Sequence, residues 1–226
     1  MIKYLVRLLI YVVVAFVTWS IGAVIVYKYV PVTVTPLKVI RFVQNFPDAG
    51  FKFSSRWVAL DKINPSMVRA VISTEDNNFV EHHGIDYGAI KQAIKDNRKK
   101  KRLRGGSTIS QQTAKNVFCL PSRTWLRKGF ETWYTLLIEL IWGKERIMEV
   151  YLNVIETGVN VYGVQGAAQK FYNKDASELN TYEASMIAAV LPNPRVRNIG
   201  KPTKYMVSRA TQIRSLMKKI GPVELD

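Results

Sequence analysis

Two adjacent carboxylates, Glu75 and Asp76, are the residues of this sequence best suited to acid–base chemistry. They follow an apolar segment predicted to be helical, and Phe79 comes four residues after Glu75, so these two side chains are expected to share a helix face. A carboxylate on an apolar face is costly unless it is paired or used, and burial raises its pKa toward that of a general base. Taken alone, the stretch is better explained by a surface Glu75 and a capping Asp76, because perturbed carboxylates are a minority.

A glycine-rich stretch, 105–116, holds a second polar group. Thr108 with Gln111 fits a capping box, which predicts that a helix begins there. A glycine-rich loop that enters a helix N-terminus can bind phosphate, and Lys115 would add a positive charge on the face that carries Gln111 and Asn116. The alternative is an ordinary capped amphipathic helix. The stretch lacks the ending of a Walker A loop.

A third group combines cations with one acid. Arg123, Arg127 and Glu131 are spaced four residues apart, and Lys128 lies three residues before Glu131, so a helix starting at 121–122 would align them. The alternative is a surface helix with ion pairs worth about a few tenths of a kcal/mol each. The helix then becomes apolar and aromatic up to Gly143, which would carry Glu131 toward a core.

The elements that must position these groups are predicted to be helices. Asn64 and Pro65 mark a helix start, Asp86 can cap the next helix, and His82 is interpreted as a hydrogen-bonding residue of the turn between them. The predicted helices span about 65–78, 87–97, 108–116, 122–143, 144–153, 167–172, 181–191 and 203–219.

The amino terminus predicts a membrane anchor. Twenty uncharged, mainly apolar residues lie between Arg7 and Lys28, and about 20 apolar residues span the hydrocarbon core of a bilayer as a helix. The run is longer than the apolar region of a signal peptide, and no convincing cleavage site follows it. Lys3 and Arg7 should stay in the cytoplasm, which places the rest of the chain outside.

The sequence divides into three predicted parts. Residues 1–30 form a cytoplasmic head and anchor, residues 31–60 an extended connector with short strands at 51–53 and 57–60, and residues 61–226 one domain.

Composition limits the partners. The 226 residues carry a net charge of +16, which indicates a polyanionic partner. Beside a membrane anchor, that partner is better sought among anionic headgroups or lipid-linked phosphates than nucleic acid, and the basic run 95–104 is interpreted as a mobile loop that contacts the bilayer. One cysteine, Cys119, excludes an intrachain disulfide and a thiolate metal cluster, and two adjacent histidines make a histidine metal site unexpected.

Read together, the motifs resemble glycosyltransferase family 51 peptidoglycan polymerases, specifically the monofunctional biosynthetic peptidoglycan transglycosylases. The sequence departs from the family pattern at His83. The resemblance covers roughly residues 60 to 195 and is carried, in order, by E-D-N-N-F-V-E-H-H-G-I-D (75–86), G-G-S-T-I-S-Q-Q-T-A-K-N (105–116), R-K-G-F-E (127–131), the stretch 144–172 and E-A-S-M-I-A-A-V-L-P-N-P (183–194).

The resemblance implies a mainly α, lysozyme-like catalytic domain with a membrane-proximal jaw, and polymerisation of lipid II with inversion at the donor carbon. Glu75 would be the general base and Glu131 would act on the donor side. Lys115 and Arg123, supported by Arg127 and Lys128, would neutralise the pyrophosphate. The donor pocket would be shaped by Ser107, Thr108, Gln111, Gln112 and Asn116, and the site supported by Asp76, Phe79, His82, Gly84 and Asp86.

The resemblance also implies partners and a location. It allows a divalent cation, magnesium or manganese, at Glu131. Its partners would be lipid II, the nascent glycan strand, the membrane and other cell-wall synthesis proteins, with no nucleic acid. The protein would lie in the bacterial inner membrane with its catalytic domain in the periplasm.

Two other functions remain open. A glycan-cleaving enzyme of the lysozyme or lytic type would use a catalytic acid but needs no pyrophosphate site, so the cations of 105–131 argue against it. A non-enzymatic membrane scaffold that binds acidic lipid or nucleic acid would tolerate loss of Glu75 and Glu131 while depending on the basic run 95–104.

Overall fold

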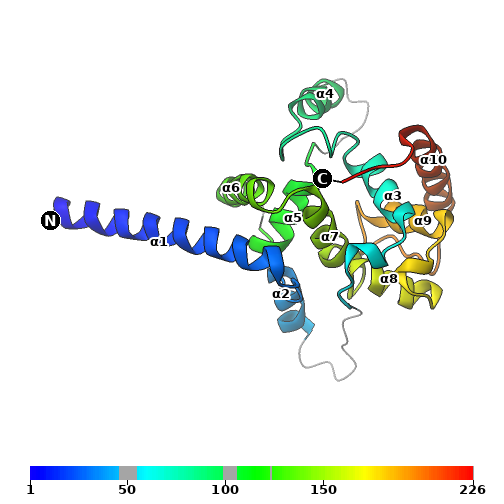
Figure 1. Ribbon diagram of the computed structural model, residues 1–226, viewed down its shortest axis with the longest axis horizontal. Helices are drawn as coiled ribbons and strands as arrows, with labels where there is room; N and C mark the ends of the chain where they lie inside the picture. The colour runs from blue at the N-terminus through cyan, green and yellow to red at the C-terminus, as the bar shows by residue number, and fades with distance from the viewer. Residues whose placement is uncertain (46–54, 99–105, 123, 226) are drawn as a thin grey trace.

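The computed structural model describes residues 1–45, 55–98, 106–122 and 124–225, and it is mainly α-helical, as the sequence predicts. One long helix, α1, projects from a body of shorter helices (Figure 1). The helices of the body are α3 (Pro65–Glu75), α4 (Tyr87–Arg98), α5 (Ile109–Phe118), α6 (Trp125–Ile141), α7 (Lys144–Val154), α8 (Gly163–Tyr172), α9 (Thr181–Val190) and α10 (Lys204–Ile220).

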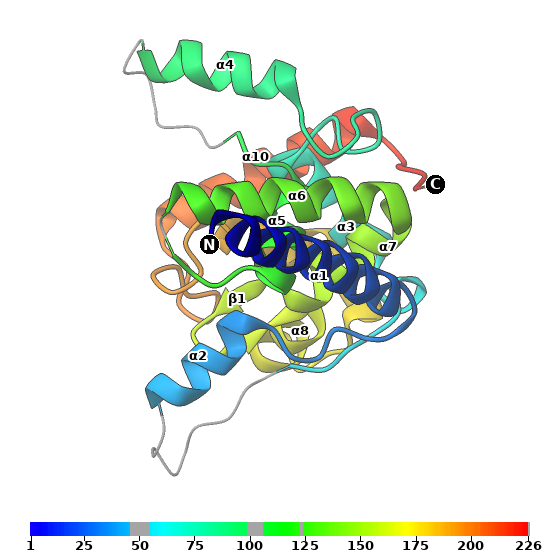
Figure 2. The same ribbon diagram turned by 90° about the vertical axis from the view of Figure 1, so that its left-hand side faces the viewer.

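Helix α1 (Ile2–Tyr29) is long and apolar enough to cross a membrane, by length and composition. Its second half docks on the body along α6 (Figure 2). The indole Nε1 of Trp133 donates to Ser20 Oγ at 3.0 Å, and that of Trp142 donates to the carbonyl of Val24 at 2.7 Å. These two hydrogen bonds therefore fix α1 to the body of the protein.

The segment after α1 is less extended than predicted, because it contains helix α2 (Pro36–Asn45). The backbone N–H of Lys38 donates to Thr35 Oγ1 at 3.3 Å, and Pro36 occupies the first helical position, so Thr-Pro was an unrecognised helix start. The strand expected at 57–60 is also wrong, since a 3₁₀ turn, η1 (Leu60–Lys62), begins there. The strand expected at 51–53 lies outside the described residues.

Side-chain caps define most helix starts of the body. The Asn64 side chain accepts from the Ser66 N–H at 2.9 Å and Pro65 follows it, while Asn180 and Glu183 form a capping box at α9. Helix α3 packs against α9 and α10, and α5 packs against α6 and α7. Fully buried side chains form the core of the body, among them Met67, Phe79, Ile109, Ile138, Tyr151 and Ile187.

Two predicted helix starts are wrong, those of α6 and α8. Helix α6 begins at Trp125, because Thr124, and not the Pro121–Ser122 pair, provides the cap that accepts from the Arg127 N–H at 3.2 Å. Gly143, with φ of 79°, follows the C-cap residue Trp142 and ends α6 as predicted, and α7 begins at the next residue. The loop before α8 holds a hairpin of β1 (Glu156–Gly158) and β2 (Val161–Tyr162), and α8 starts at Gly163; a second 3₁₀ turn, η2 (Ala176–Glu178), precedes α9.

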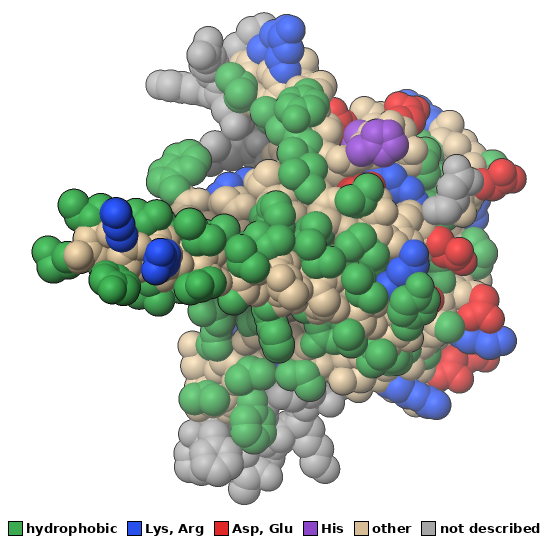
Figure 3. All heavy atoms as spheres, turned by 60° about the vertical axis from the view of Figure 1, so that its left-hand side comes forward, with side chains coloured by type: hydrophobic (Ala, Val, Ile, Leu, Met, Phe, Trp, Pro, Cys, Tyr) green, Lys and Arg blue, Asp and Glu red, His purple; other side chains and the backbone are tan. Residues whose placement is uncertain are grey.

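One side of the molecule is apolar. Hydrophobic side chains cover α1 and the face of the body beside it (Figure 3). On α6 the exposed large hydrophobic residues are Trp125, Leu126, Phe130, Leu136 and Leu140, the last of which is 83% exposed. Large contiguous apolar surfaces indicate contact with a membrane or a partner.

Candidate active site

Glu75 is the last residue of α3, and its half-buried carboxylate faces α5. Gln112 Nε2 donates to Glu75 Oε2 at 3.0 Å. Burial raises the pKa of Glu75, while the Gln112 hydrogen bond and the charges of Arg209 and Lys115 oppose that rise. A carboxylate with a raised pKa is suited to accept and return a proton near neutral pH.

Phe79 does not share a helix face with Glu75, because α3 ends at Glu75 and Phe79 lies in the turn that follows. Its ring is fully buried, and the ammonium of Lys144 lies 4.7 Å from the ring centroid. The buried Phe79 ring therefore helps to hold the turn that follows Glu75 in place.

Asp76 joins the end of α3 to the start of α5. Its Oδ2 accepts from the backbone N–H of Ile109 at 2.9 Å, so this carboxylate caps α5. His82 Nε2 lies 2.9 Å from Asp76 Oδ1, and the Gly84 N–H donates to His82 Nδ1 at 3.1 Å. The His82 proton consequently resides on Nε2, and His82 has the hydrogen-bonding role that the sequence predicted.

The rest of the turn is held by hydrogen bonds of the Thr108, Asp86 and Asn78 side chains. Thr108 Oγ1 donates to the Gly84 carbonyl at 2.6 Å. Asp86 caps α4 as expected, since its Oδ1 accepts from the Ala89 N–H at 2.7 Å, and Asn78 donates to its other oxygen at 2.9 Å. The Ala89 hydrogen bond is the main cause of the lowered pKa of Asp86.

The predicted capping box opens α5. The Gln111 N–H donates to Thr108 Oγ1 at 3.1 Å, and the Thr108 N–H donates to Gln111 Oε1 at 3.1 Å. Both side chains are buried, whereas Ser107 is exposed and Asn116 half-buried. Thr108 and Gln111 thus build the helix start, and Gln112 is the residue of α5 that contacts Glu75.

The charge of Lys115 interacts with both candidate acids, Glu75 and Glu131. Its side chain is exposed by surface area, yet the protein crowded around it lowers its pKa. Glu131 and Glu75 oppose that change, whereas Arg127 and Lys128 add to it. Because water reaches this ammonium, the shift carries little stability.

Glu131 is buried in α6, with 3% of its surface exposed. Arg127 Nη1 and Lys128 Nζ each donate to one of its carboxylate oxygens, so the buried charge is paired on both sides. With Lys115, these residues form a cluster of three cations and one acid that keeps a positive charge for an anionic ligand. Arg123, predicted to join them, lies outside the described residues.

The described side chains around Glu131 do not form a metal site. Among the described residues, no group of three or more His, Cys, Asp and Glu side chains could hold a metal ion. Both oxygens of Glu131 already accept from cations. The divalent cation expected from the resemblance therefore stays a prediction.

Several residues of the site were missed in the sequence. Tyr151 is fully buried and its hydroxyl donates to Gln112 Oε1 at 3.3 Å, which orients the amide that donates to Glu75. Arg209 of α10 acts on Glu75 through its charge. Glu139 accepts from Lys144 at 2.8 Å and from Ser110; a lone acid in the apolar part of α6 was a signal that could have found it.

The arrangement combines a proton acceptor with a cationic cluster. Glu75 can take a proton from a hydroxyl, and Lys115, Arg127 and Lys128 can stabilise a departing anion. This combination suits the transfer of a group to an alcohol from a donor that carries an anionic leaving group.

Comparison with known proteins decides the family. A family model described as Transglycosylase matches residues 42–218, which includes Glu75, the α5 start and Glu131. The chain belongs to the transglycosylase family. Biosynthetic peptidoglycan transglycosylases are 51% identical in Bdellovibrio bacteriovorus and 52% identical in Bacteroides thetaiotaomicron, and these matches cover 90% and 91% of this chain and 80% and 84% of the relatives. A relative of the same description in Caulobacter vibrioides is 46% identical over 90% of this chain and 86% of its own length.

These matches confirm the family that the motifs indicated, together with a mainly helical, lysozyme-like fold and an enzymatic activity of the glycosyltransferase type. The hydrogen bonds described above give this transglycosylase an explicit site geometry. The roles of the individual residues remain predictions.

Proposed function

We propose that this transglycosylase polymerises lipid II into β-1,4-linked glycan strands, with inversion at the donor carbon and release of undecaprenyl pyrophosphate. The observation that carries the proposal is the pairing of Glu75, a carboxylate with a raised pKa, with the cations Lys115, Arg127 and Lys128. The names of the relatives support the choice of substrate.

Glu75 acts as the general base in this proposal. It accepts the proton of the acceptor 4-hydroxyl while that oxygen forms a bond to the donor anomeric carbon. The bond from that carbon to the pyrophosphate oxygen breaks, and its electron pair leaves with the pyrophosphate. Gln112, itself held by Tyr151, orients the carboxylate for the transfer.

The cationic cluster stabilises the leaving group. Lys115, Arg127 and Lys128 face the negative charge that grows on the pyrophosphate, with Arg123 added by the resemblance. Glu131 acts on the donor side by holding Arg127 and Lys128 in place. Ser107, Thr108, Gln111, Gln112 and Asn116 shape the donor pocket in this account.

The membrane supplies the substrate. Helix α1 would span the bacterial inner membrane with Lys3 and Arg7 in the cytoplasm, leaving the catalytic domain in the periplasm. The exposed apolar residues of α6 lie beside α1, so they would enter the same bilayer. A lipid-linked donor then reaches the Glu75 site without leaving the membrane.

The experiment is a test of both directions of glycan chemistry. Purified full-length protein in detergent is given labelled lipid II, and separately preformed glycan strands. We expect long strands from lipid II and intact preformed glycan. Cleavage of preformed glycan without polymerisation would instead support the lysozyme-like alternative, and inactivity of a folded protein in both assays would support the scaffold.

A further inference from the structure

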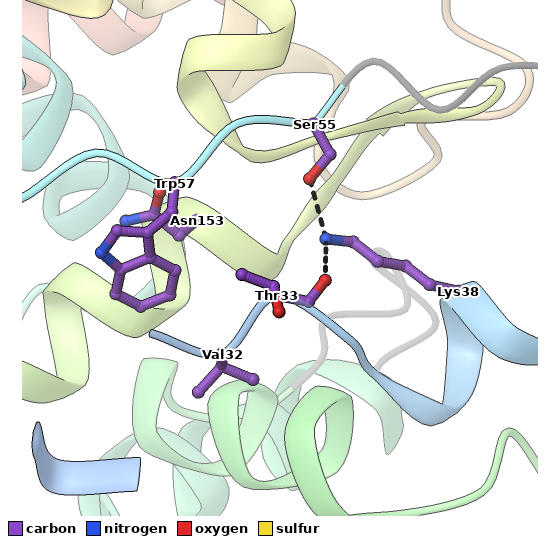
Figure 4. Close-up of a pocket in the computed structure, with 6 residues that line it drawn as sticks. All are labelled: Val32, Thr33, Lys38, Ser55, Trp57 and Asn153. Atoms are coloured by element: carbon purple, nitrogen blue, oxygen red, sulfur yellow. Dashed lines mark hydrogen bonds between the residues drawn. The ribbon is translucent and has the colours of Figure 1, made fainter. Parts of the chain in front are cut away.

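A pocket that none of the candidate active-site residues lines lies where the chain leaves α1 (Figure 4). Its volume is about 210 Å³, and it is lined by Val32, Thr33, Lys38, Ser55, Trp57 and Asn153. These residues come from the segment after α1, from α2, from the segment before η1 and from α7. Nothing in the proposed transferase reaction uses them.

The pocket contains a buried cation for which the described part of the chain provides no acidic partner. Only 6% of Lys38 is exposed, and its ammonium donates to the Thr33 carbonyl at 3.0 Å and to Ser55 Oγ at 2.8 Å. The Tyr162 ring centroid lies 5.5 Å from the same ammonium. No ion pair joins Lys38 to an acid of the described residues, and burial lowers its pKa to about 8. A buried charge with only neutral partners is stabilised by an anion.

The remaining lining groups define that anion. The Asn153 amide is already engaged, since it donates to the Val58 carbonyl at 2.8 Å and accepts from the Val58 N–H at 2.9 Å. Ser55 accepts from Lys38, which leaves its own hydroxyl proton for a ligand oxygen. Trp57 and Val32 give an apolar wall. The pocket thus suits a small monoanion that accepts two hydrogen bonds and carries an apolar group.

The position of the pocket indicates where the bound anion would come from. Val32 lies three residues after Tyr29, the last residue of α1, so the pocket lies at the level of lipid headgroups when α1 spans a bilayer. Helix α2 also exposes Val39, Phe42 and Val43, a face typical of an interfacial helix. This step rests on the membrane anchoring proposed above.

We propose that the pocket binds the phosphodiester of an anionic phospholipid headgroup, with Lys38 as its cationic contact and Ser55 as a hydroxyl donor. Such a lipid would fasten the segment between α1 and α2 to the domain at the membrane surface.

The test measures lipid retention by the full-length protein in non-ionic detergent. Phosphatidylglycerol and phosphatidylcholine are titrated separately, and bound lipid is counted by native mass spectrometry. We expect wild type to bind phosphatidylglycerol more tightly than phosphatidylcholine. The affinity for phosphatidylglycerol should fall about tenfold or more in Lys38→Met, because this variant loses a charge-assisted hydrogen bond. Lys38→Arg keeps the charge and should keep the affinity. The matched control Lys62→Met changes an exposed lysine of η1 and should bind as wild type does.

Three outcomes would overturn the proposal. The first is unchanged phosphatidylglycerol binding by a folded Lys38→Met variant, and the second is equal binding of the two lipids by wild type. The third is full displacement of the lipid by inorganic phosphate at equal concentration, which would make the pocket a phosphate site without a lipid. Polymerisation of lipid II by Lys38→Met, expected at the wild-type rate, separates this proposal from the transferase proposal.

Discussion

At the scale of a residue, the chemistry of Glu75 depends on opposing influences on one carboxylate. Burial raises its pKa, and Gln112, Arg209 and Lys115 restrain the rise. A fully solvated glutamate would be a weaker base, and an unopposed buried one would stay protonated. The neighbours therefore adjust the pH at which Glu75 can accept a proton.

Replacing Gln112 by alanine should move the pH dependence of the reaction. The lost hydrogen bond stabilised ionised Glu75, so its pKa rises further and the acidic limb of kcat/KM shifts to higher pH. Arg209→Met should shift the limb in the same direction, because it removes a nearby positive charge. The position of the acidic limb is measured from the rate of polymerisation as a function of pH, with Lys218→Met on α10 as the control. An unmoved limb in both variants would contradict the assignment.

The ionised carboxylate of Glu75 should also lower the stability of the folded protein. Its folded pKa is raised, so its contribution is most favourable below the unfolded pKa and is lost as pH rises through the folded value. Glu75→Gln should therefore melt at a higher temperature than wild type at pH 8, with a smaller difference at pH 4. Thermal unfolding in detergent at both values checks this, and a gap that widens toward acid would refute it.

Sequence reasoning named most residues of the candidate site at this scale, since Glu75, Lys115 and Glu131 are marked by their residue types and spacing. It placed Phe79 wrongly because the end of α3 at Glu75 was not visible. Tyr151 and Arg209 were missed because their proximity depends on packing between helices distant in sequence.

At the scale of elements, the site depends on the junction between α3 and α5. Asp76 caps α5 with its side chain, and the following turn folds back through His82, Gly84 and Thr108. Gly84 has φ of 88°, and a Cβ there would lie 2.8 Å from Thr135 Cγ2. Only glycine fits this position without displacement of α6.

Gly84→Ala should destabilise the domain by about 1–3 kcal/mol, since it adds a steric clash to an unfavourable backbone conformation. Gly129→Ala is the matched control, because a Cβ at this exposed position of α6 meets nothing within 4 Å. That substitution should stabilise the helix by about 0.5–1 kcal/mol. Chemical denaturation measures both, and equal stabilities of the two variants would argue against the close contact at Gly84.

The helix starts at Asn64, Thr108, Asn180 and Thr203 were predictable because these signals are local, whereas the Thr35 and Thr124 caps were overlooked. Helix α2 was not found, because an apolar, β-branched stretch favoured an extended chain and its Thr-Pro start was overlooked. The hairpin of β1 and β2 was not found either, since its two strands are only three and two residues long.

At the scale of the molecule, the anchor and the domain form one unit. Arg146 Nη2 donates to the carbonyls of Tyr27 and Val30, at 2.8 Å each, and its guanidinium lies 5.1 Å from the Trp57 ring centroid. The unpaired carbonyls at the end of α1 are thereby satisfied by the domain. No sequence pattern indicated this, because over 100 residues separate the partners.

Arg146→Met should loosen the end of α1 without altering the turn after Glu75. We expect hydrogen exchange of backbone amides in 24–30 to accelerate about tenfold, since the end of the helix loses hydrogen bonds worth more than 1 kcal/mol. Arg56→Met, which changes an exposed arginine of the segment before η1, should exchange as wild type does. Equal protection of α1 in both variants would show that Arg146 does not fasten the anchor.

The central claim is that Glu75 is the base of a glycan polymerase. The most direct measurement compares polymerisation of labelled lipid II by wild type, Glu75→Gln and the exposed control Glu81→Gln, all confirmed as folded. We predict that Glu75→Gln slows polymerisation by about 10²–10⁴-fold, the range of general-base catalysis, while Glu81→Gln polymerises as wild type does. Polymerisation by Glu75→Gln at the wild-type rate would contradict the account.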